Sequence, residues 1–161
     1  MKKKLIHAVL LLLILPAIFI GCSSSIPLDR LSDAQIQALP TNGKAVLLHF
    51  WATWCEPCRK EIPELNRLHE KYPGVEFFAI NLDDVENQGA IAPFLKKYPI
   101  NFKVVLRSGQ DFQNMAQSLD PDWKGGVPAT FVFQDGKRIF NKIGEVSVQE
   151  LDETLQYLGA S

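Results

Sequence analysis

Cysteine is scarce in this sequence of 161 residues, which contains three, an odd number. Three cysteines cannot form the framework of a disulfide-dense secreted miniprotein, and any pairing leaves one over. An excess of one charge is also missing, because 17 basic and 18 acidic side chains nearly cancel. This balance argues against a nucleic-acid-binding protein, which normally carries a clustered positive excess. The length fits one globular domain and is too short for two ordinary ones.

One long apolar run is present, and it stands near the N-terminus. Three lysines, Lys2 to Lys4, precede the apolar residues 5–20, which Pro16 interrupts. A basic start followed by such a run is typical of a bacterial secretory signal. The run is short for a membrane-spanning helix, which needs about 20 apolar residues. The segment therefore predicts export of the chain that follows it.

The apolar run ends at Gly21 and Cys22, and three serines follow. A small residue directly before this cysteine resembles the lipobox of bacterial lipoproteins, which implies cleavage before Cys22 and a lipid on its sulfur. An uncleaved anchor and an ordinary cleaved signal are the alternatives, and all three place the rest outside the cytoplasm. Without the signal the chain keeps 14 basic and 18 acidic side chains and no basic patch for anionic lipids. We divide the chain into a signal at 1–21, a tether with a short helix at 22–40, and one domain at 41–161.

Strand and helix patterns alternate along the exported part. Apolar runs rich in β-branched and aromatic residues predict strands at 45–52, 75–82, 102–106, 129–134 and 138–143, the last two joined by an Asp135-Gly136 turn. Helical spacing of apolar residues predicts helices at 28–39, 57–72, 85–98, 111–119 and 147–158. This order implies an α/β fold with a mixed central sheet and helices on both faces.

Two cysteines, Cys55 and Cys58, stand three residues apart where a predicted strand gives way to a helix. Such a small disulfide loop stabilises a fold by only about 2 kcal/mol, against roughly 3 for a 15-residue loop, so the bond suits reversible chemistry. The unpaired N–H groups and the positive dipole end of a helix N-terminus favour a thiolate. We expect Cys55 to be the more exposed, attacking thiol and Cys58 to be the resolving thiol.

The neighbouring residues fit this position, and two other interpretations fit it less well. Pro57 suits the first helical turn, while Arg59 and Lys60 would favour the thiolate and Glu56 would oppose it. A zinc site needs four ligands, and the histidines at 49 and 69 lie roughly 20 and 16 Å from the pair along a strand and a helix. An inert buried pair would not need a strand-to-helix turn.

The sequence around the pair resembles the thioredoxin superfamily, and within it the TlpA/ResA-type branch of extracytoplasmic reductases. The resemblance rests on residues 51–63, which hold both cysteines, and on residues 127–131, and it covers about residues 41–161. It implies the thioredoxin fold, no separate cofactor, and reduction of disulfides in exported client proteins, as in cytochrome c maturation or copper-site assembly. It also implies a membrane partner of the CcdA/DsbD kind that returns electrons. A disulfide oxidase or isomerase of the same fold, and a non-catalytic binding lipoprotein, are the alternatives.

The resemblance also implies roles for residues around the cysteines. Pro128 matches the cis-proline of the family and would present the Val127 backbone to an extended client chain. Trp54 would shield the Cys55 sulfur, whereas Trp51 is expected to be a core residue. Residues 120–126 are rich in glycine and contain Trp123, and we favour a role in shaping a client groove over a packed surface turn.

An acid is expected to serve the proton of Cys58. ResA-like proteins carry such an acid after the next strand, and Asp84 matches that position best. A buried carboxylate suits this proton transfer. The alternative is that Asp83 and Asp84 cap the following helix. For His49, which stands where cytoplasmic thioredoxins have a buried aspartate, we favour a satisfied core residue over a proton relay.

Overall fold

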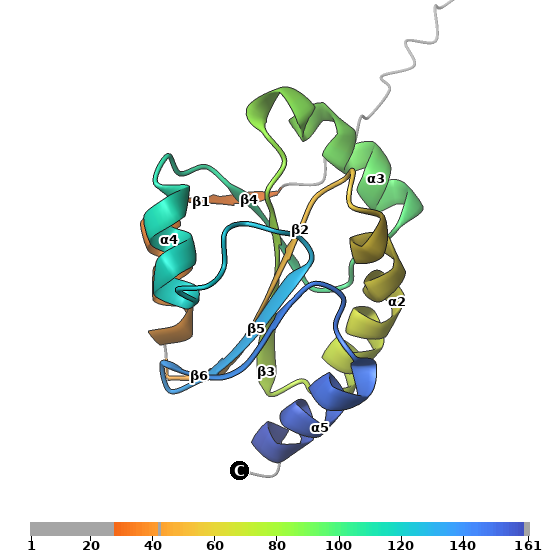
Figure 1. The fold of residues 1–161 in the computed structure, drawn as a ribbon. Coiled ribbons are helices and arrows are strands. Elements are labelled where there is room, and N and C mark those ends of the chain that lie inside the picture. Colours follow the sequence, from red (N-terminus) through yellow and green to blue (C-terminus); the bar gives the residue numbers. More distant parts are fainter. Residues whose placement is uncertain (1–27, 42, 160–161) are drawn as a thin grey trace, which may run out of the picture.

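The computed structural model describes residues 28–41 and 43–159, and its central element is a sheet of six strands. The strands lie in the order β1-β4-β3-β2-β5-β6 (Figure 1). The pairs β1–β4, β4–β3 and β3–β2 are parallel, whereas β2–β5 and β5–β6 are antiparallel. This confirms the predicted α/β class with a mixed sheet. The predicted signal and Cys22 lie outside the described residues.

The middle of the sheet consists of three buried strands. β2 (Ala45–Trp51) is buried at every residue and pairs with β3 (Val75–Asn81) on one side and with β5 (Ala129–Gln134) on the other. Strands covered on both faces have nearly continuous apolar sequences, which is why these were the clearest strands in the sequence. The carboxyl end of β2 leads directly to the cysteines.

The outer strands are shorter or more exposed. On one side β4 (Lys103–Arg107) is followed by the three-residue edge strand β1 (Asp29–Leu31). On the other side β6 (Lys137–Ile143) forms the edge and joins β5 through the predicted turn. Asp135 and Gly136 in this turn both have positive φ, 50° and 76°, which suits the tight hairpins that such a pair favours.

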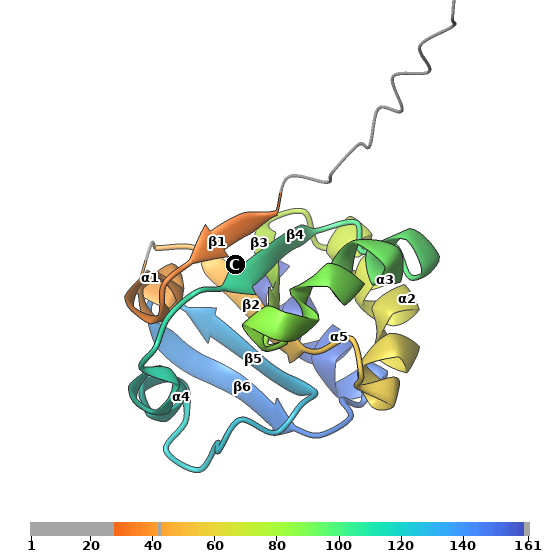
Figure 2. The same ribbon diagram turned by 90° about the horizontal axis from the view of Figure 1, so that it is seen from above.

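Helices form a layer on each side of the sheet (Figure 2). One face is covered by α2 (Glu56–Lys71), α3 (Ile91–Lys97) and α5 (Val148–Gly159), and the other by α1 (Asp33–Ala38) and α4 (Phe112–Leu119). Each layer encloses its own core. Because side chains alternate along a strand, Leu47 and Trp51 of β2 pack in the α2 core, while Leu48 and Phe50 pack in the α4 core.

The helix predicted at 28–39 is wrong in its first part. Residues Asp29–Leu31 form β1, and Ser32 then caps α1 in a capping box with Gln35. A three-residue strand is too short for a periodic signal, and its partner β4 lies more than 70 residues away in the sequence. A 3-10 helix, Leu39–Thr41, completes the segment. The segment predicted as one short helix therefore contributes an edge strand to the sheet and a short helix that covers it.

The helix predicted at 85–98 is in fact two elements. A 3-10 helix, Val85–Ala90, is followed by α3, and Pro93 lies in the first turn of α3. A proline is tolerated there because first-turn N–H groups have no helical partner. The other predicted strands and helices agree with the structure to within one or two residues. No helix in the described ranges has the length and apolar character needed to cross a membrane.

Candidate active site

A disulfide joins Cys55 and Cys58 at the turn between β2 and α2, with an S–S distance of 2.01 Å and a Cα–Cα distance of 5.3 Å. Cys55 is the N-cap of α2, and its Sγ accepts a hydrogen bond from the Cys58 N–H at 3.2 Å. A sulfur in this position lies against the unpaired N–H groups and the positive dipole end of the helix. The structure therefore shows the oxidised pair, in a setting that stabilises a thiolate on Cys55 after reduction.

The two cysteines are covered to different degrees. Cys55 is 3% exposed and Cys58 is fully buried. The order matches the expectation that Cys55 is the more accessible sulfur, although the difference is small. Trp54 precedes the pair and is 67% exposed, so its ring forms part of the surface beside the disulfide. Pro57 lies in the first turn of α2, and the exposed Glu56 carboxylate pairs with Lys60 at 3.4 Å.

The Val127–Pro128 peptide bond is cis, at the position where the resemblance implied it. Pro128 directly precedes β5, and the first residue of β5, Ala129, pairs with Phe50 near the end of β2. The proline thus lies at the same end of the sheet as the cysteines. Its carbonyl accepts a hydrogen bond from the Gly144 N–H at 2.8 Å.

Glu61, which the sequence analysis missed, is a buried carboxyl group on α2. It lies three residues after Cys58, on the same side of the helix. Its Oε1 accepts a hydrogen bond from the Val146 N–H at 2.5 Å, while Oε2 is buried without a hydrogen bond. The pKa of Glu61 is raised to about 7, mainly by burial; the Val146 hydrogen bond opposes this shift and the charge of Glu145 adds to it. A carboxyl group of this kind exchanges a proton near neutral pH.

The signal for Glu61 was its place in the helical pattern. Cys58, Ile62, Leu65 and Leu68 form the buried stripe of α2, and position 61 adjoins that stripe. An acid at such a position is buried, and that makes it a candidate for proton transfer.

Asp84 does not occupy the place that the sequence predicted. It is exposed, and its side chain makes no cap hydrogen bond to the 3-10 helix that it precedes. The prediction that it is the buried carboxylate of the site is therefore wrong. The strand β3 ends at residue 81, so the chain has already left the core when it reaches Asp84.

The neighbouring Asp83 is buried and has a structural role. Its carboxylate accepts hydrogen bonds from the Thr53 N–H and Oγ1, both at 2.9 Å, and from Asn81 Nδ2 at 2.7 Å. Thr53 lies two residues before Cys55. Asp83 thus links the turn before the cysteines to the end of β3 by hydrogen bonds.

His49 is buried on β2, and only one of its two ring nitrogens has a hydrogen-bond partner. Its Nδ1 lies 3.0 Å from Thr130 Oγ1, whereas Nε2 has no hydrogen bond and lies 3.8 Å from Glu61 Oε2. Burial lowers the pKa of His49 to about 4, so the ring is neutral at pH 7. The sequence predicted a buried histidine with all its hydrogen bonds made. This is correct for Nδ1 and wrong for Nε2.

Trp123 does not line a groove. The indole is fully buried and packs against Phe50 at a ring distance of 4.5 Å, and its Nε1–H donates to the Gly126 carbonyl at 2.8 Å. The ring therefore supports the loop before Val127 from inside the α4 core. This corrects the groove hypothesis for the tryptophan and fits the alternative of a packed turn.

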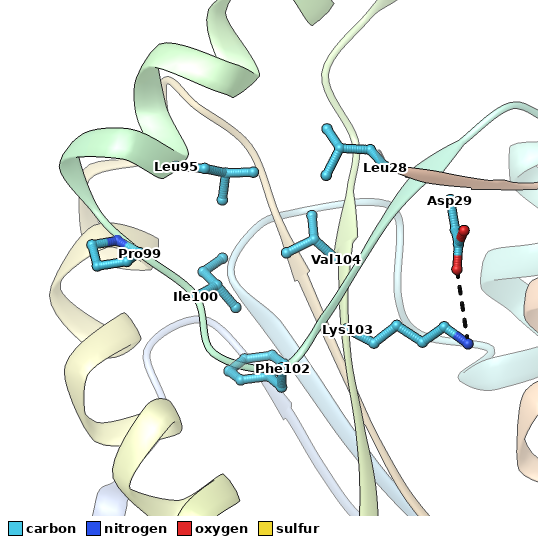
Figure 3. A pocket seen from close by; sticks show the side chains of 8 residues that line it. All are labelled: Leu28, Asp29, Leu95, Pro99, Ile100, Phe102, Lys103 and Val104. Atoms are coloured by element: carbon cyan, nitrogen blue, oxygen red, sulfur yellow. Dashed lines mark ion pairs between the residues drawn. The ribbon is translucent and has the colours of Figure 1, made fainter. Parts of the chain in front are cut away.

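A hollow of about 350 Å³ lies at another part of the molecule, between the end of α3 and the start of β4 (Figure 3). At its rim Lys103 pairs with Asp29 at 3.9 Å. None of its lining residues belongs to the disulfide site, and we assign it no part in the chemistry. They are Leu28, Asp29, Leu95, Pro99, Ile100, Phe102, Lys103 and Val104.

A redox-capable cysteine pair at a helix start, next to a cis-proline and on a mixed sheet with two helical layers, defines a thioredoxin-like thiol-disulfide oxidoreductase. The comparisons with known proteins agree with this class. The chain belongs to the AhpC/TSA family, whose family model matches residues 25–141.

Among curated proteins, the chain is similar to a thiol-disulfide oxidoreductase ResA of Bacillus cereus. The two are 35% identical over 129 residues, which cover 78% of this chain and 70% of the relative. ResA of Bacillus subtilis strain 168 is 37% identical over 113 residues, covering 68% of this chain and 59% of the relative. The chain is therefore a ResA-like thiol-disulfide oxidoreductase.

Solved structures with the same fold include StoA from Bacillus subtilis, with a TM-score of 0.56 and 27% identity over 71% of this chain and 84% of that chain. A thioredoxin-related protein from Neisseria meningitidis serogroup B has a TM-score of 0.61 and 27% identity over 74% and 88%. These similarities confirm the predicted thioredoxin fold.

Proposed function

We propose that this oxidoreductase reduces disulfide bonds of exported client proteins, with Cys55 as the attacking and Cys58 as the resolving thiol. The observation that carries the proposal is the Cys55–Cys58 disulfide at the N-terminus of α2, with the buried Glu61 carboxyl one helical turn further on. The helix start favours a thiolate on Cys55, and the full burial of Cys58 suits a thiol that acts only inside the protein.

The reaction transfers two electrons from the reduced cysteine pair to the client. The Cys55 thiolate attacks one sulfur of the client disulfide, and the other client sulfur leaves as a thiolate. Cys58 then loses its proton and attacks the Cys55 sulfur, which forms the Cys55–Cys58 disulfide and releases the second client sulfur as a thiolate. The client ends with two reduced cysteines and the enzyme with the disulfide that the structure contains.

Glu61 is the group that accepts the proton of Cys58 in this step. It takes the role that the sequence analysis gave to Asp84, because it is buried and lies on the same side of α2 as Cys58. A pKa near 7, raised by burial, allows the carboxylate to accept the proton and to release it at neutral pH.

The surface beside the disulfide suits an extended client segment. The indole of Trp54 is exposed, and Val127 is partly buried next to the cis-proline, with free space beyond Gly126. An extended chain that passes the Val127 backbone would pair with it as a strand does and bring a cysteine to Cys55.

The location and the partners follow from the N-terminal sequence and the resemblance. We propose a lipid on Cys22, an extracytoplasmic site of action, and a membrane partner of the CcdA/DsbD type that reduces the disulfide again. The clients are proteins of cytochrome c maturation or copper-site assembly. One solved relative, a disulfide oxidoreductase from Mycobacterium tuberculosis, is described as secreted, which supports an extracytoplasmic location.

The experiment that tests the function is capture of clients with Cys58→Ala in producing cells. Without the resolving thiol, Cys55 should remain joined to clients as mixed disulfides that a reducing agent releases. Apocytochrome or a copper-site protein among them would identify the pathway. The double variant Cys55→Ala/Cys58→Ala is the control and should capture none. Absence of any mixed disulfide at normal protein level would contradict the proposal.

The direction of the reaction is tested by the redox potential of the pair. A value close to −270 mV, roughly that of thioredoxin, is expected for a reductase, and one near −120 mV would instead support a DsbA-like oxidase. Equilibration with glutathione or dithiothreitol buffers measures it.

A further inference from the structure

A histidine and a glutamate face each other between the sheet and α2, and each leaves one polar atom unpaired. His49 Nε2 and Glu61 Oε2 are 3.8 Å apart, and the two side chains are 1% and 8% exposed. Among the buried side-chain nitrogen and oxygen atoms of the described residues, three lack a hydrogen bond, and two of them are these atoms. Buried polar atoms in native proteins are nearly always paired, so two complementary ones at this distance call for an explanation.

The hydrogen bond on the other ring nitrogen determines what His49 can offer. If Nδ1–H donates to Thr130 Oγ1 at 3.0 Å, Nε2 carries a lone pair and is an acceptor. The complementary group facing it is a protonated Glu61 carboxyl, whose Oε2–H would donate to that lone pair. A small movement of the Glu61 side chain shortens 3.8 Å to a hydrogen bond.

The pKa shifts of His49 and Glu61 agree with this hydrogen bond. Burial lowers the pKa of His49 to about 4 and raises that of Glu61 to about 7, so a proton taken up by the pair resides on the carboxyl and the ring stays neutral. Near pH 7 Glu61 is present both as the carboxylate that can accept a proton and as the protonated carboxyl. The charged neighbour that acts on Glu61 is Glu145, in the loop before α5, which also favours the protonated carboxyl. From the sheet, the neutral Thr130 of β5 contacts His49, and Trp51, also neutral, follows two residues along β2 on the same face.

We propose that His49 and Glu61 form one proton-holding pair, in which His49 positions the Glu61 carboxyl that receives the proton of Cys58. The inference rests on the proposed function and deepens it. As Cys58 attacks the Cys55 sulfur of a mixed disulfide, the proton of Cys58 moves to Glu61 Oε2, and the new O–H donates to His49 Nε2. The Cys55–client bond breaks, the Cys55–Cys58 bond forms, and the client sulfur leaves with the electron pair. His49 is a positioning residue and gains no charge in this step.

The first test is the nitrogen-15 spectrum of the His49 ring in the full-length oxidised protein, from about pH 5 to about pH 9. We expect the Nδ1–H tautomer throughout and an Nε2 signal that shifts with the midpoint of Glu61, near 7, because the hydrogen bond to Nε2 is lost when the carboxyl ionises. Glu61→Gln should abolish this shift. The amide of this variant would keep an oxygen for the Val146 N–H, which protects the fold.

His69 is the matched control in the same sample. It lies near the other end of α2, where its ring contacts Phe77 and its Nδ1 lies 3.3 Å from Asn101 Oδ1, away from Glu61. Its signal should be the same in wild type and in Glu61→Gln. The chain has three histidines, so single His→Gln variants assign the signals. A His49 signal that is identical in wild type and Glu61→Gln would overturn the pair.

The second test is the pH dependence of the resolution step, measured as release of a thiol probe from a mixed disulfide on Cys55. In wild type the rate should change slope near pH 7, the midpoint of Glu61. In His49→Leu the protonated carboxyl loses its acceptor, so we expect the midpoint of Glu61 to fall by about one unit. The rate at pH 7 should fall by roughly two- to fivefold, because the carboxylate is a weaker base although a larger fraction of it is ionised. His69→Leu should change neither.

The outcomes separate this inference from the proposed function. If His49→Leu reduces clients normally and its resolution step keeps the same pH midpoint, the His49–Glu61 pair is refuted while the proposed function stands. Failure of the wild type to reduce insulin or any thiol probe would refute the proposed function, whatever the ring signals show. If His49→Leu does not fold, the spectra of wild type and Glu61→Gln still decide the matter.

Discussion

At the scale of single residues, His49 and Glu61 respond to burial in opposite directions, and each makes stability depend on pH. Burial raises the pKa of Glu61 from 4.5 to about 7, so its contribution to stability is complete below pH 4.5 and is lost as the pH rises through 7. Burial lowers the pKa of His49 from 6.5 to about 4, so its contribution is complete above pH 6.5 and is lost as the pH falls through 4.

Glu61→Gln should remove the pH dependence of stability that comes from Glu61. We expect the wild type to lose roughly 1–3 kcal/mol of its free energy of unfolding between pH 4.5 and 7 through this group, and the variant to keep it. Urea unfolding at a series of pH values measures the difference. Glu64→Gln, on the partly exposed side of the same helix, is the control and should follow the wild type. Parallel curves for wild type and Glu61→Gln would contradict the assigned shift.

The sequence identifies some functional residues and not others for physical reasons. Cys55, Cys58 and Pro128 stand in short local motifs, which are visible without the fold. The helical pattern of α2 indicates that Glu61 adjoins the buried stripe, but it does not show the groups that Glu61 meets, which are the Val146 N–H and the His49 ring. Val146 lies 85 residues from Glu61 and His49 lies on the preceding strand, so only the fold brings these groups together.

At the scale of elements, the turn between β2 and α2 is held from the end of the neighbouring strand β3. Asp83, just beyond β3, accepts two hydrogen bonds from Thr53, and Asn81 donates a third. The start of α2, and with it the position of Cys55, therefore depends on a parallel strand pairing formed by residues about 30 positions later.

Asp83→Ala should destabilise the protein by about 1–3 kcal/mol, because the Thr53 N–H would be left without its partner. Asp84→Ala, at the exposed neighbouring position, should change stability by less than about 0.5 kcal/mol. Urea unfolding of the two variants beside the wild type makes the comparison. Equal effects of the two substitutions would show that the Thr53 contacts contribute little.

Elements were predictable where one local property decides their structure. β2 and β3 are apolar along their whole length because both faces are covered, and α2 repeats apolar residues at helical spacing. β1 is three residues long, and only its pairing with β4 makes it a strand. The break between Val85–Ala90 and α3 likewise depends on packing, since the composition of both pieces suits one helix.

At the scale of the whole molecule, the disulfide is expected to contribute little to the stability of the fold. The bond joins residues separated by 3 positions, so it restricts the unfolded chain very little. Two separate cores, one on each face of the sheet, contain most of the buried apolar side chains. An enzyme that opens and closes this bond in each cycle needs a reduced form that stays folded.

We expect reduction to lower the free energy of unfolding by about 2 kcal/mol or less. Leu68→Ala, which empties a fully buried site in the α2 core, should lower it by about 2–5 kcal/mol. Urea unfolding with and without dithiothreitol, on wild type and on this variant, gives both numbers. Unfolding of the wild type on reduction alone would contradict the expectation.

The segment 144–146 has a consequence for how such an enzyme can change during evolution. Gly144 donates its N–H to the Pro128 carbonyl, and Val146 donates its N–H to the Glu61 carboxylate. Two residues of chain span at most about 7 Å, so this segment limits the distance between the Pro128 carbonyl and the Glu61 carboxyl. An insertion or deletion here would change the distance between these two attachment points. In the proposed mechanism, client binding and proton transfer would therefore both depend on the length of this short loop.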